Sequence, residues 1–204
     1  KFVVANTLIG LEKPKKLVDL FEQTTIKLER KLKELRHRYF IAKTRKEKME
    51  CRKEDKILRG EIARLLMDAG WAFETAKQIA MFDIYDQNAS TGWFDSEWMF
   101  GVTDSFDIVI ANPPYVFARE SKKKGLSNED KGYFYKHYDL AEYQMNLYPL
   151  FIEKGTCLLR ANGCLCFITP NNWLTINTNK KLREFVLGRL LRNVKSAITA
   201  HHIL

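Results

Sequence analysis

The sequence lacks the features of a membrane or secreted protein. No apolar run reaches the length that spans a bilayer, and the first residues do not have the layout of a signal peptide. These absences predict a cytoplasmic protein with no membrane partner. The cysteines have no CxxC spacing and no matching histidine pattern, which predicts reduced thiols and no metal site. They are Cys51, Cys157, Cys164 and Cys166, and the last two are expected on one face of a strand.

Glycine-rich phosphate loops and an excess of acidic residues are absent as well. The ten glycines never form a G-x-G pattern, and 25 acidic residues stand against 34 lysines and arginines in a chain of 204 residues. The net charge of +9 and the isoelectric point near 9.3 favour a polyanionic partner, although charge alone does not define a fold. The length is sufficient for one hydrophobic core and a smaller additional element.

Residues 105–115, with the sequence SFDIVIANPPY, organise the rest of the chain. Their apolar run predicts a short strand that is covered on both faces. Pro113 and Pro114 end this strand because proline cannot donate a ladder hydrogen bond, and Pro113 biases Asn112 toward extended geometry. Ligands bind at the carboxyl ends of strands in an open parallel sheet. The Asn112 side chain is therefore expected at a binding edge, and a plain strand with a Pro-Pro turn is the simpler alternative.

The segment FDIVIANPPY resembles the catalytic motif of amino-methyltransferases that use S-adenosylmethionine, in particular the adenine-specific DNA methyltransferases of the type IIG restriction-modification kind. That family usually has glycine where this chain has Ala111. The resemblance implies that Asn112, Pro113, Pro114 and Tyr115 are catalytic. The Asn112 side-chain oxygen and the Pro113 carbonyl would hold the two amino hydrogens of adenine. Tyr115 would stack on a base that has rotated out of double-stranded DNA.

The same resemblance assigns a cofactor contact to the first strand. Residues 1–9 predict a strand that ends in a polar turn, and Asn6 falls where the family contacts the adenine ring of S-adenosylmethionine. Asn6 and Asn112 are thus the expected cofactor-binding residues, and an Asn in an ordinary turn is the alternative for Asn6. The family has a glycine-bearing loop before this strand and a target-recognition domain further along. Neither is evident, so we expect a fragment that is inactive without the remaining N- and C-terminal parts of a parent chain.

Residues 12–70 have the pattern of a basic helical hairpin. Apolar residues at steps of three and four predict a first helix, and Thr44 with Glu47 at capping-box spacing starts a second helix that stops at Gly70. The apolar positions are Leu17, Phe21, Leu28, Leu32, Leu35 and Tyr39 in the first helix, and Ile57, Leu58, Ile62, Leu65 and Leu66 in the second. Residues 12–64 contain 18 lysines and arginines and 10 acidic residues, so the positive charge is local. This segment is either a phosphate-contacting arm or a solvated coiled-coil face.

The hairpin is expected to interrupt a methyltransferase core. The predicted parts are a first strand and turn (1–11), the inserted hairpin (12–70) and the rest of the core (71–204). In the simplest methyltransferases the two strands that carry residues like Asn6 and Asn112 are close in sequence, whereas here they are far apart. The aromatic residues between 71 and 104 are expected to pack a core.

Residues 116–140 predict a mobile loop that contacts DNA as a partly ordered lid. Its lysines Lys122, Lys123 and Lys124 are substrate-binding candidates because lysine can contact phosphate, although such contacts carry no base specificity. Its aromatic residues Tyr133, Phe134, Tyr135 and Tyr138 could either stack on bases or pack against the protein.

The end of the chain predicts a crossover back to the central sheet. A helix over 141–160, stopped at Asn162-Gly163, leads to a buried strand over 164–169. Asn172 and Trp173 follow at the same sheet edge as Asn112, which makes them substrate-binding candidates. A helix over 179–191 and a strand over 194–199 complete the predicted elements.

Together these elements predict an α/β fold, namely a partial Rossmann-like methyltransferase sheet with an inserted α-helical hairpin. The expected function is methyl transfer from S-adenosylmethionine to the exocyclic amino group of adenine in DNA, in a restriction-modification or phage-defence enzyme. Two alternatives stay open. The motif also occurs in enzymes that methylate glutamine side chains or ribosomal RNA, and the hairpin could be the functional part of a non-catalytic interaction fragment. The basic hairpin and the long segment after the motif favour DNA.

Overall fold

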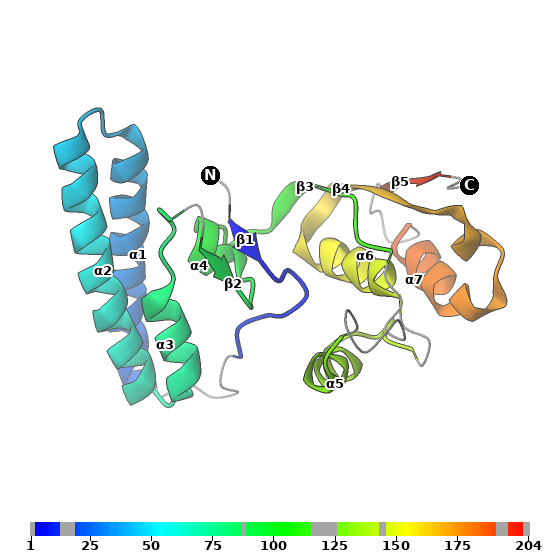
Figure 1. The fold of residues 1–204 in the computed structure, drawn as a ribbon, viewed down its shortest axis with the longest axis horizontal. Coiled ribbons are helices and arrows are strands. Elements are labelled where there is room, and N and C mark those ends of the chain that lie inside the picture. The colour runs from blue at the N-terminus through cyan, green and yellow to red at the C-terminus, as the bar shows by residue number, and fades with distance from the viewer. Residues whose placement is uncertain are drawn as a thin grey trace. The chain divides into compact units, whose positions relative to one another are not determined.

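The chain forms two compact units, each with its own hydrophobic core. A computed structural model describes residues 3–12, 19–86, 89–115, 126–142, 146–190 and 196–201 (Figure 1). The first unit comprises Lys1–Asn6 and Gly10–Gly101, and the second comprises Thr7–Ile9 and Val102–Leu204. Helices and strands alternate along the chain, and the strands form two small sheets in which all described pairs are parallel. This arrangement confirms the predicted α/β class.

Two long helices form a hairpin in the first unit. Helix α1 (Asp19–Ile41) and helix α2 (Arg45–Asp68) lie side by side and are joined by a short connection (Figure 1). The predicted capping box is confirmed, because the Glu47 amide donates to the Thr44 hydroxyl at 3.2 Å and the Thr44 amide donates to the Glu47 carboxylate at 3.1 Å. The chain leaves α2 through Gly70, whose φ of +93° is a conformation that favours glycine.

A buried carboxylate joins this hairpin to the rest of its unit. Asp55 is 0% exposed and accepts hydrogen bonds from Arg36 Nε at 3.0 Å and Arg59 Nε at 2.6 Å. The same guanidinium groups donate to the backbone carbonyls of Trp98 and Ala80, so α1 and α2 are connected to the segments that follow them. Two of the hairpin's basic side chains are therefore engaged inside the protein.

The remaining elements of the first unit are short. They are α3 (Phe73–Met81), α4 (Ser96–Phe100), and the two-residue strands β1 (Val4–Ala5) and β2 (Ser90–Thr91), which pair in parallel. Four aromatic residues of this region are buried as predicted, namely Trp71, Phe82, Trp93 and Trp98, whereas Phe73 and Phe100 are exposed and do not follow the prediction. Ile57 was expected on the buried stripe of the second helix but is exposed, because Leu58 and Ile62 face the core instead.

A three-stranded parallel sheet organises the second unit. Its strands are β3 (Phe106–Ala111), β4 (Leu159–Pro170) and β5 (Ser196–His201), in the order β3-β4-β5. Helix α6 (Leu147–Leu158) is the second of two described helices between β3 and β4 and directly precedes β4, and Ala111 pairs with Phe167 near the ends of the two strands. The strand, helix, strand connection expected from the sequence is confirmed.

Helix α6 covers one face of this sheet closely. Leu165, Phe167 and Thr169 alternate along β4 and are buried on that face. A Cβ atom at Gly155 of α6 would lie 2.7 Å from the Phe167 ring and 2.9 Å from Leu165, so the helix rests directly on the strand. Such distances are too short for any side chain at this position.

The other face of the sheet is open in the described part of the chain. Ile108 is 59% exposed, Ile110 is 75% exposed and Ile168 is 41% exposed. The prediction that the central strand is covered on both faces is therefore wrong for the described residues, since α6 packs on one side of β3 only. Cys164 and Cys166 share this open face and are half-buried, as their two-residue spacing predicts for one strand.

Several predicted boundaries shift in the second unit. Helix α6 begins at Leu147 and not at residue 141, and β4 begins immediately after it. Asn162 does have a positive φ of 62°, but it lies in an irregularity of β4, where Phe106 pairs with Leu159 and Ile108 with Cys164. Its left-handed conformation therefore marks a bulge in a strand and not the end of a helix.

A helix occupies part of the predicted mobile loop. Helix α5 (Asn128–His137) starts with a capping box between Ser127 and Asp130. Phe134 is buried. The buried Glu153 carboxylate accepts hydrogen bonds from the backbone N–H groups of Asp139 and Leu140, shortly after α5, at 2.9 and 2.8 Å. The expectation of a loop is wrong for residues 126–142, because a capped helix and a buried carboxylate hold this segment.

The last elements agree closely with the predictions. The 3-10 turns η1 (Asn171–Leu174) and η2 (Asn177–Asn179) lead into helix α7 (Lys180–Leu190), and β5 follows. No helix among the described residues is long and apolar enough to cross a membrane. The described residues also contain no group of three or more histidine, cysteine or acidic side chains placed to hold a metal ion.

Candidate active site

The Asn-Pro-Pro-Tyr segment begins where β3 ends. Asn112 is exposed, Pro113 is buried, Pro114 is exposed and Tyr115 is half-buried. Because β3 and β4 are parallel neighbours, the residues that follow each strand emerge at the same edge of the sheet. The buried proline holds the loop in the protein while the adjacent Asn112 side chain faces outward.

The hydroxyl of Tyr115 connects this segment to the neighbouring strand. The Tyr115 oxygen lies 3.1 Å from Asn112 Oδ1 and 2.9 Å from the backbone carbonyl oxygen of Ile168 in β4. The Tyr115 ring also makes an edge contact with Tyr148, with ring centroids 6.4 Å apart and planes at 81°. The hydroxyl and the ring of Tyr115 thus each contact neighbouring residues.

Tyr148 supports the site from the first turn of α6. It is buried, and Asn146, which caps this helix, accepts the Tyr148 backbone N–H at 3.4 Å. Burial raises the pKa of the Tyr148 phenol to about 12, because an ionised oxygen would lose its contact with water. The phenol is therefore neutral at physiological pH.

The two candidates after β4 have different environments. Asn172 is exposed, whereas Trp173 is 5% exposed and its indole N–H donates to Thr169 Oγ1 at 3.3 Å. Arg183 of α7 donates to the Trp173 carbonyl at 2.7 Å. The Trp173 ring packs in the core and offers no face to a base in this conformation, so only Asn172 keeps the expected accessibility.

Asn6 lies in the first unit, directly after β1. Its backbone N–H donates to the Thr91 carbonyl at 3.0 Å and its side chain is exposed. Asn112 belongs to the second unit, so the pairing of Asn6 with Asn112 at one cofactor stays a prediction. Lys122, Lys123 and Lys124 lie outside the described residues.

Sequence reasoning missed two partners of the motif. Tyr148 had no distinguishing signal beyond its place in an apolar helix, although the preceding Asn146 is a typical helix cap. The Ile168 contact is made by a backbone carbonyl, which no side-chain pattern could reveal.

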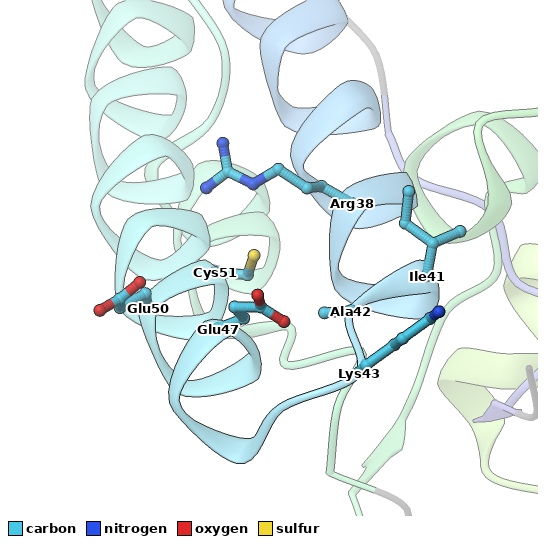
Figure 2. A pocket seen from close by; sticks show the side chains of 7 residues that line it. All are labelled: Arg38, Ile41, Ala42, Lys43, Glu47, Glu50 and Cys51. Atoms are coloured by element: carbon cyan, nitrogen blue, oxygen red, sulfur yellow. The ribbon is translucent and has the colours of Figure 1, made fainter.

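A separate surface hollow lies at the tip of the hairpin. Its volume is about 470 Å³, and Figure 2 shows the side chains that surround it. They are Arg38, Ile41, Ala42, Lys43, Glu47, Glu50 and Cys51. The Cys51 thiol and, to a smaller extent, Glu54 raise the pKa of Arg38. The hollow belongs to the first unit, whereas the Asn-Pro-Pro-Tyr segment belongs to the second.

The chain is an α/β protein with short parallel sheets, and its polar Asn-Pro-Pro-Tyr turn lies at the carboxyl end of a strand, the edge at which ligands bind in open parallel sheets. The chain belongs to the Eco57I restriction-modification methylase family, which it matches over residues 15–195. This span includes both the helical hairpin and the Asn-Pro-Pro-Tyr segment.

Three relatives whose names include the word methyltransferase are similar to parts of this chain. The chain is 36% identical over 85 residues to the type II methyltransferase M.TthHB8I of Thermus thermophilus, covering 41% of this chain and 20% of the relative. It is 31% identical over 81 residues to the type II restriction enzyme and methyltransferase RM.Eco57I of Escherichia coli, covering 40% and 8%. It is 29% identical over 98 residues to the adenine-specific methyltransferase BrxX of Escherichia coli, covering 48% and 7%. The matched segments thus span a fifth or less of these relatives.

Proposed function

We propose that the full-length protein transfers a methyl group from S-adenosylmethionine to the exocyclic amino group of adenine in DNA, as part of a restriction-modification or phage-defence enzyme. The observation that carries the proposal is the exposed Asn112 amide at the carboxyl end of β3, fixed between a buried proline and Tyr115. Membership of the Eco57I restriction-modification methylase family and the adenine-specific activity in the name of one relative support it.

The chemistry required is the activation of a weak nucleophile. The lone pair of an aromatic amino group is delocalised into the ring, so attack on a methyl group needs the nitrogen to become more tetrahedral. Asn112 Oδ1 and the Pro113 carbonyl oxygen accept one amino hydrogen each and thereby favour this geometry. Pro114 stiffens the loop that holds both acceptors, since its ring fixes φ.

Tyr115 provides the surface for the base. The target nitrogen is inaccessible inside a duplex, so adenine must leave the base stack before reaction. The Tyr115 ring is half-buried and packs against Tyr148 in a T-shaped contact, and we propose that its accessible part is the stacking surface for the base. Asn172, exposed after β4, is proposed to contact the substrate from the neighbouring strand.

The cofactor is proposed to bind through amide side chains. When bound, S-adenosylmethionine supplies an electrophilic methyl group on a positively charged sulfur. The exposed Asn6 and Asn112 can each donate and accept hydrogen bonds, which suits the adenine and amino acid groups of this cofactor. Because the matches span a fifth or less of the relatives, we propose that the complete site also uses the remaining N- and C-terminal parts of the full-length protein.

The test is transfer of tritiated methyl from S-adenosylmethionine to an adenine-containing duplex by the full-length protein. Asn112→Ala should lower the rate by about 100-fold or more, as removal of a single charge-stabilising group does in other enzymes. Asn177→Ala, which changes an exposed asparagine in η2, is the matched control and should retain activity.

Digestion of the labelled product identifies the acceptor. Label in N6-methyladenine is expected. Label in cytosine, or transfer to ribosomal RNA or protein glutamine when these replace the duplex as acceptor, would replace adenine in DNA as the substrate. Full transfer by Asn112→Ala would remove Asn112 from the mechanism, and no transfer to any acceptor by the unaltered protein would support a non-catalytic role.

A further inference from the structure

The contacts of Tyr115 contain more acceptors than one phenol can serve. Its oxygen lies within hydrogen-bond distance of Asn112 Oδ1 at 3.1 Å and of the Ile168 carbonyl oxygen at 2.9 Å. A phenol has one hydrogen to donate, and a carbonyl oxygen has none. The hydroxyl can therefore donate fully to only one of these two partners at a time.

Two arrangements satisfy this restriction. In the first, the Tyr115 hydroxyl donates to Asn112 Oδ1, which leaves the Ile168 carbonyl without this donor. In the second, the hydroxyl donates to the Ile168 carbonyl, and the Asn112 amide is turned so that its NH₂ group donates to the Tyr115 oxygen. All three groups are then joined in one chain, in which each hydrogen bond polarises the next.

The second arrangement has a direct effect on the site. An amide has an acceptor end and a donor end, so turning its donor end toward Tyr115 directs Oδ1 to the opposite side. That oxygen is then free to accept a hydrogen from a substrate amino group. In the first arrangement the NH₂ group of Asn112 faces the substrate amino group instead. Both groups are then donors, and they repel each other.

We propose that the Tyr115 hydroxyl is a positioning group that sets the orientation of the Asn112 amide, using the Ile168 carbonyl of β4 as its anchor. This inference rests on the proposed function, because it assumes that Asn112 Oδ1 accepts a hydrogen from the adenine amine. It gives Tyr115 a second role beside stacking. Stacking alone needs only a ring face, which phenylalanine supplies equally well, so it does not explain the hydroxyl.

The chemistry of the carboxylate provides a discriminating test. An ionised aspartate at position 112 has two equivalent acceptor oxygens and no donor end, so it needs no orienting partner. Tyr115→Phe, Asn112→Asp and the double variant are compared in the full-length protein with a duplex substrate. Loss of the orienting hydrogen bond should lower kcat of Tyr115→Phe by about tenfold, with KM for DNA changed less than about twofold.

The effect should depend on residue 112. In the Asn112→Asp background, the same phenylalanine is expected to change kcat by less than about twofold. Equal losses in the two backgrounds would overturn the proposal, as would a Tyr115→Phe variant with normal kcat. A loss confined to KM would also contradict it, since it would assign the hydroxyl to DNA binding.

A second measurement does not need activity. With asparagine labelled by ¹⁵N, the side-chain NH₂ resonances of Asn112 are identified by their loss in Asn112→Asp. Tyr115→Phe should move them toward the values of a solvent-exposed amide and leave those of Asn172 in place, because the hydroxyl lies within hydrogen-bond distance of the Asn112 side chain. Unmoved Asn112 resonances would overturn the proposal even if Asn112→Asp is inactive. Failure of the unaltered protein to methylate DNA would instead refute the proposed function.

Discussion

At the scale of single residues, two tyrosines of the second unit have phenols whose pKa values are raised by burial. Tyr148 contacts the Tyr115 ring and is buried, and burial raises its pKa to about 12. Tyr138 in the same unit also has a raised pKa, chiefly from burial, and its hydroxyl donates to the Leu8 carbonyl. Ionisation of either phenol would place a charge in the core.

Alkaline pH should therefore destabilise the second unit. Below about pH 10 the Tyr148 phenol is neutral in both the folded and the unfolded chain. Above about pH 10 the unfolded phenol ionises while the folded one resists until its pKa of about 12, so stability falls as the pH rises through this interval. The decrease in Tm between about pH 9 and about pH 11 should be smaller for Tyr148→Phe than for the unaltered protein.

Tyr135→Phe is the control for this pH series. Tyr135 belongs to the same unit but is exposed. Its variant should show the same alkaline decrease in Tm as the unaltered protein. An identical decrease in all three proteins would show that the Tyr148 phenol does not resist ionisation.

At the scale of elements, the hairpin is held by one buried charge cluster. Asp55 accepts from an arginine of each helix, and the Tyr85 hydroxyl lies 3.2 Å from its carboxylate. Burial and, to a smaller extent, the nearby Asp55 charge raise the pKa of Tyr85, so this phenol stays protonated. The cluster combines the two positive charges of Arg36 and Arg59 with the negative charge of Asp55 and one neutral donor, the Tyr85 hydroxyl.

Asp55→Asn should destabilise the first unit strongly. Removing the carboxylate leaves two arginines, of which Arg59 is buried, without a counter-charge, and breaking a buried ion pair in this way costs about 3–5 kcal/mol. Urea unfolding measures the loss. Glu54→Gln removes the partner of Arg38 in an exposed pair and is expected to have little effect. A similarly small effect of Asp55→Asn would show that water or rearrangement compensates the arginines.

The hairpin tip carries exposed basic residues. Arg36 of α1 is engaged with the buried Asp55 carboxylate. Lys43, Arg45 and Lys46 at the tip are exposed instead. If these three residues contact DNA, replacing all of them with glutamine should weaken DNA binding. The plot of the logarithm of the binding constant against the logarithm of the salt concentration should also become less steep, by up to about 0.9 for each lost phosphate contact.

Titration of duplex DNA at several salt concentrations separates an arm from a solvated face. Lys77, Lys180 and Lys181 are exposed lysines outside the hairpin, and their triple glutamine variant controls for net charge. Equal effects of the two triple variants would indicate a general charge effect. An unchanged slope for the tip variant would assign the hairpin charge to solubility.

At the scale of the whole molecule, locally encoded features were predictable from the sequence. The Thr44 capping box, the β3 strand that ends at the prolines and the helix that becomes α7 depend on neighbouring residues, and each lies where its pattern predicts. The parallel pairing of β3 and β4 also followed, since a helix of suitable length separates them. These features positioned Asn112 and Tyr115 at a sheet edge.

Features decided by distant partners were not predictable. Nothing near Asp55 in sequence distinguishes it from the other acidic residues of the hairpin, yet it is buried because Arg36 and Arg59 meet there. Trp173 is buried rather than available for stacking because Thr169 and α7 enclose it. The open face of β3 depends on which elements pack against the sheet, and a strand's own apolar pattern does not contain that information.

The close approach of α6 to β4 also has an evolutionary consequence. Loops can lengthen and surface charges can be exchanged without disturbing the sheet, but any side chain larger than hydrogen at Gly155 would lift the helix from Phe167. Natural selection on the family should therefore tolerate almost no variation there. A glycine on the helix that crosses from the Asn-Pro-Pro-Tyr strand to the next strand would then be a second landmark for recognising distant members.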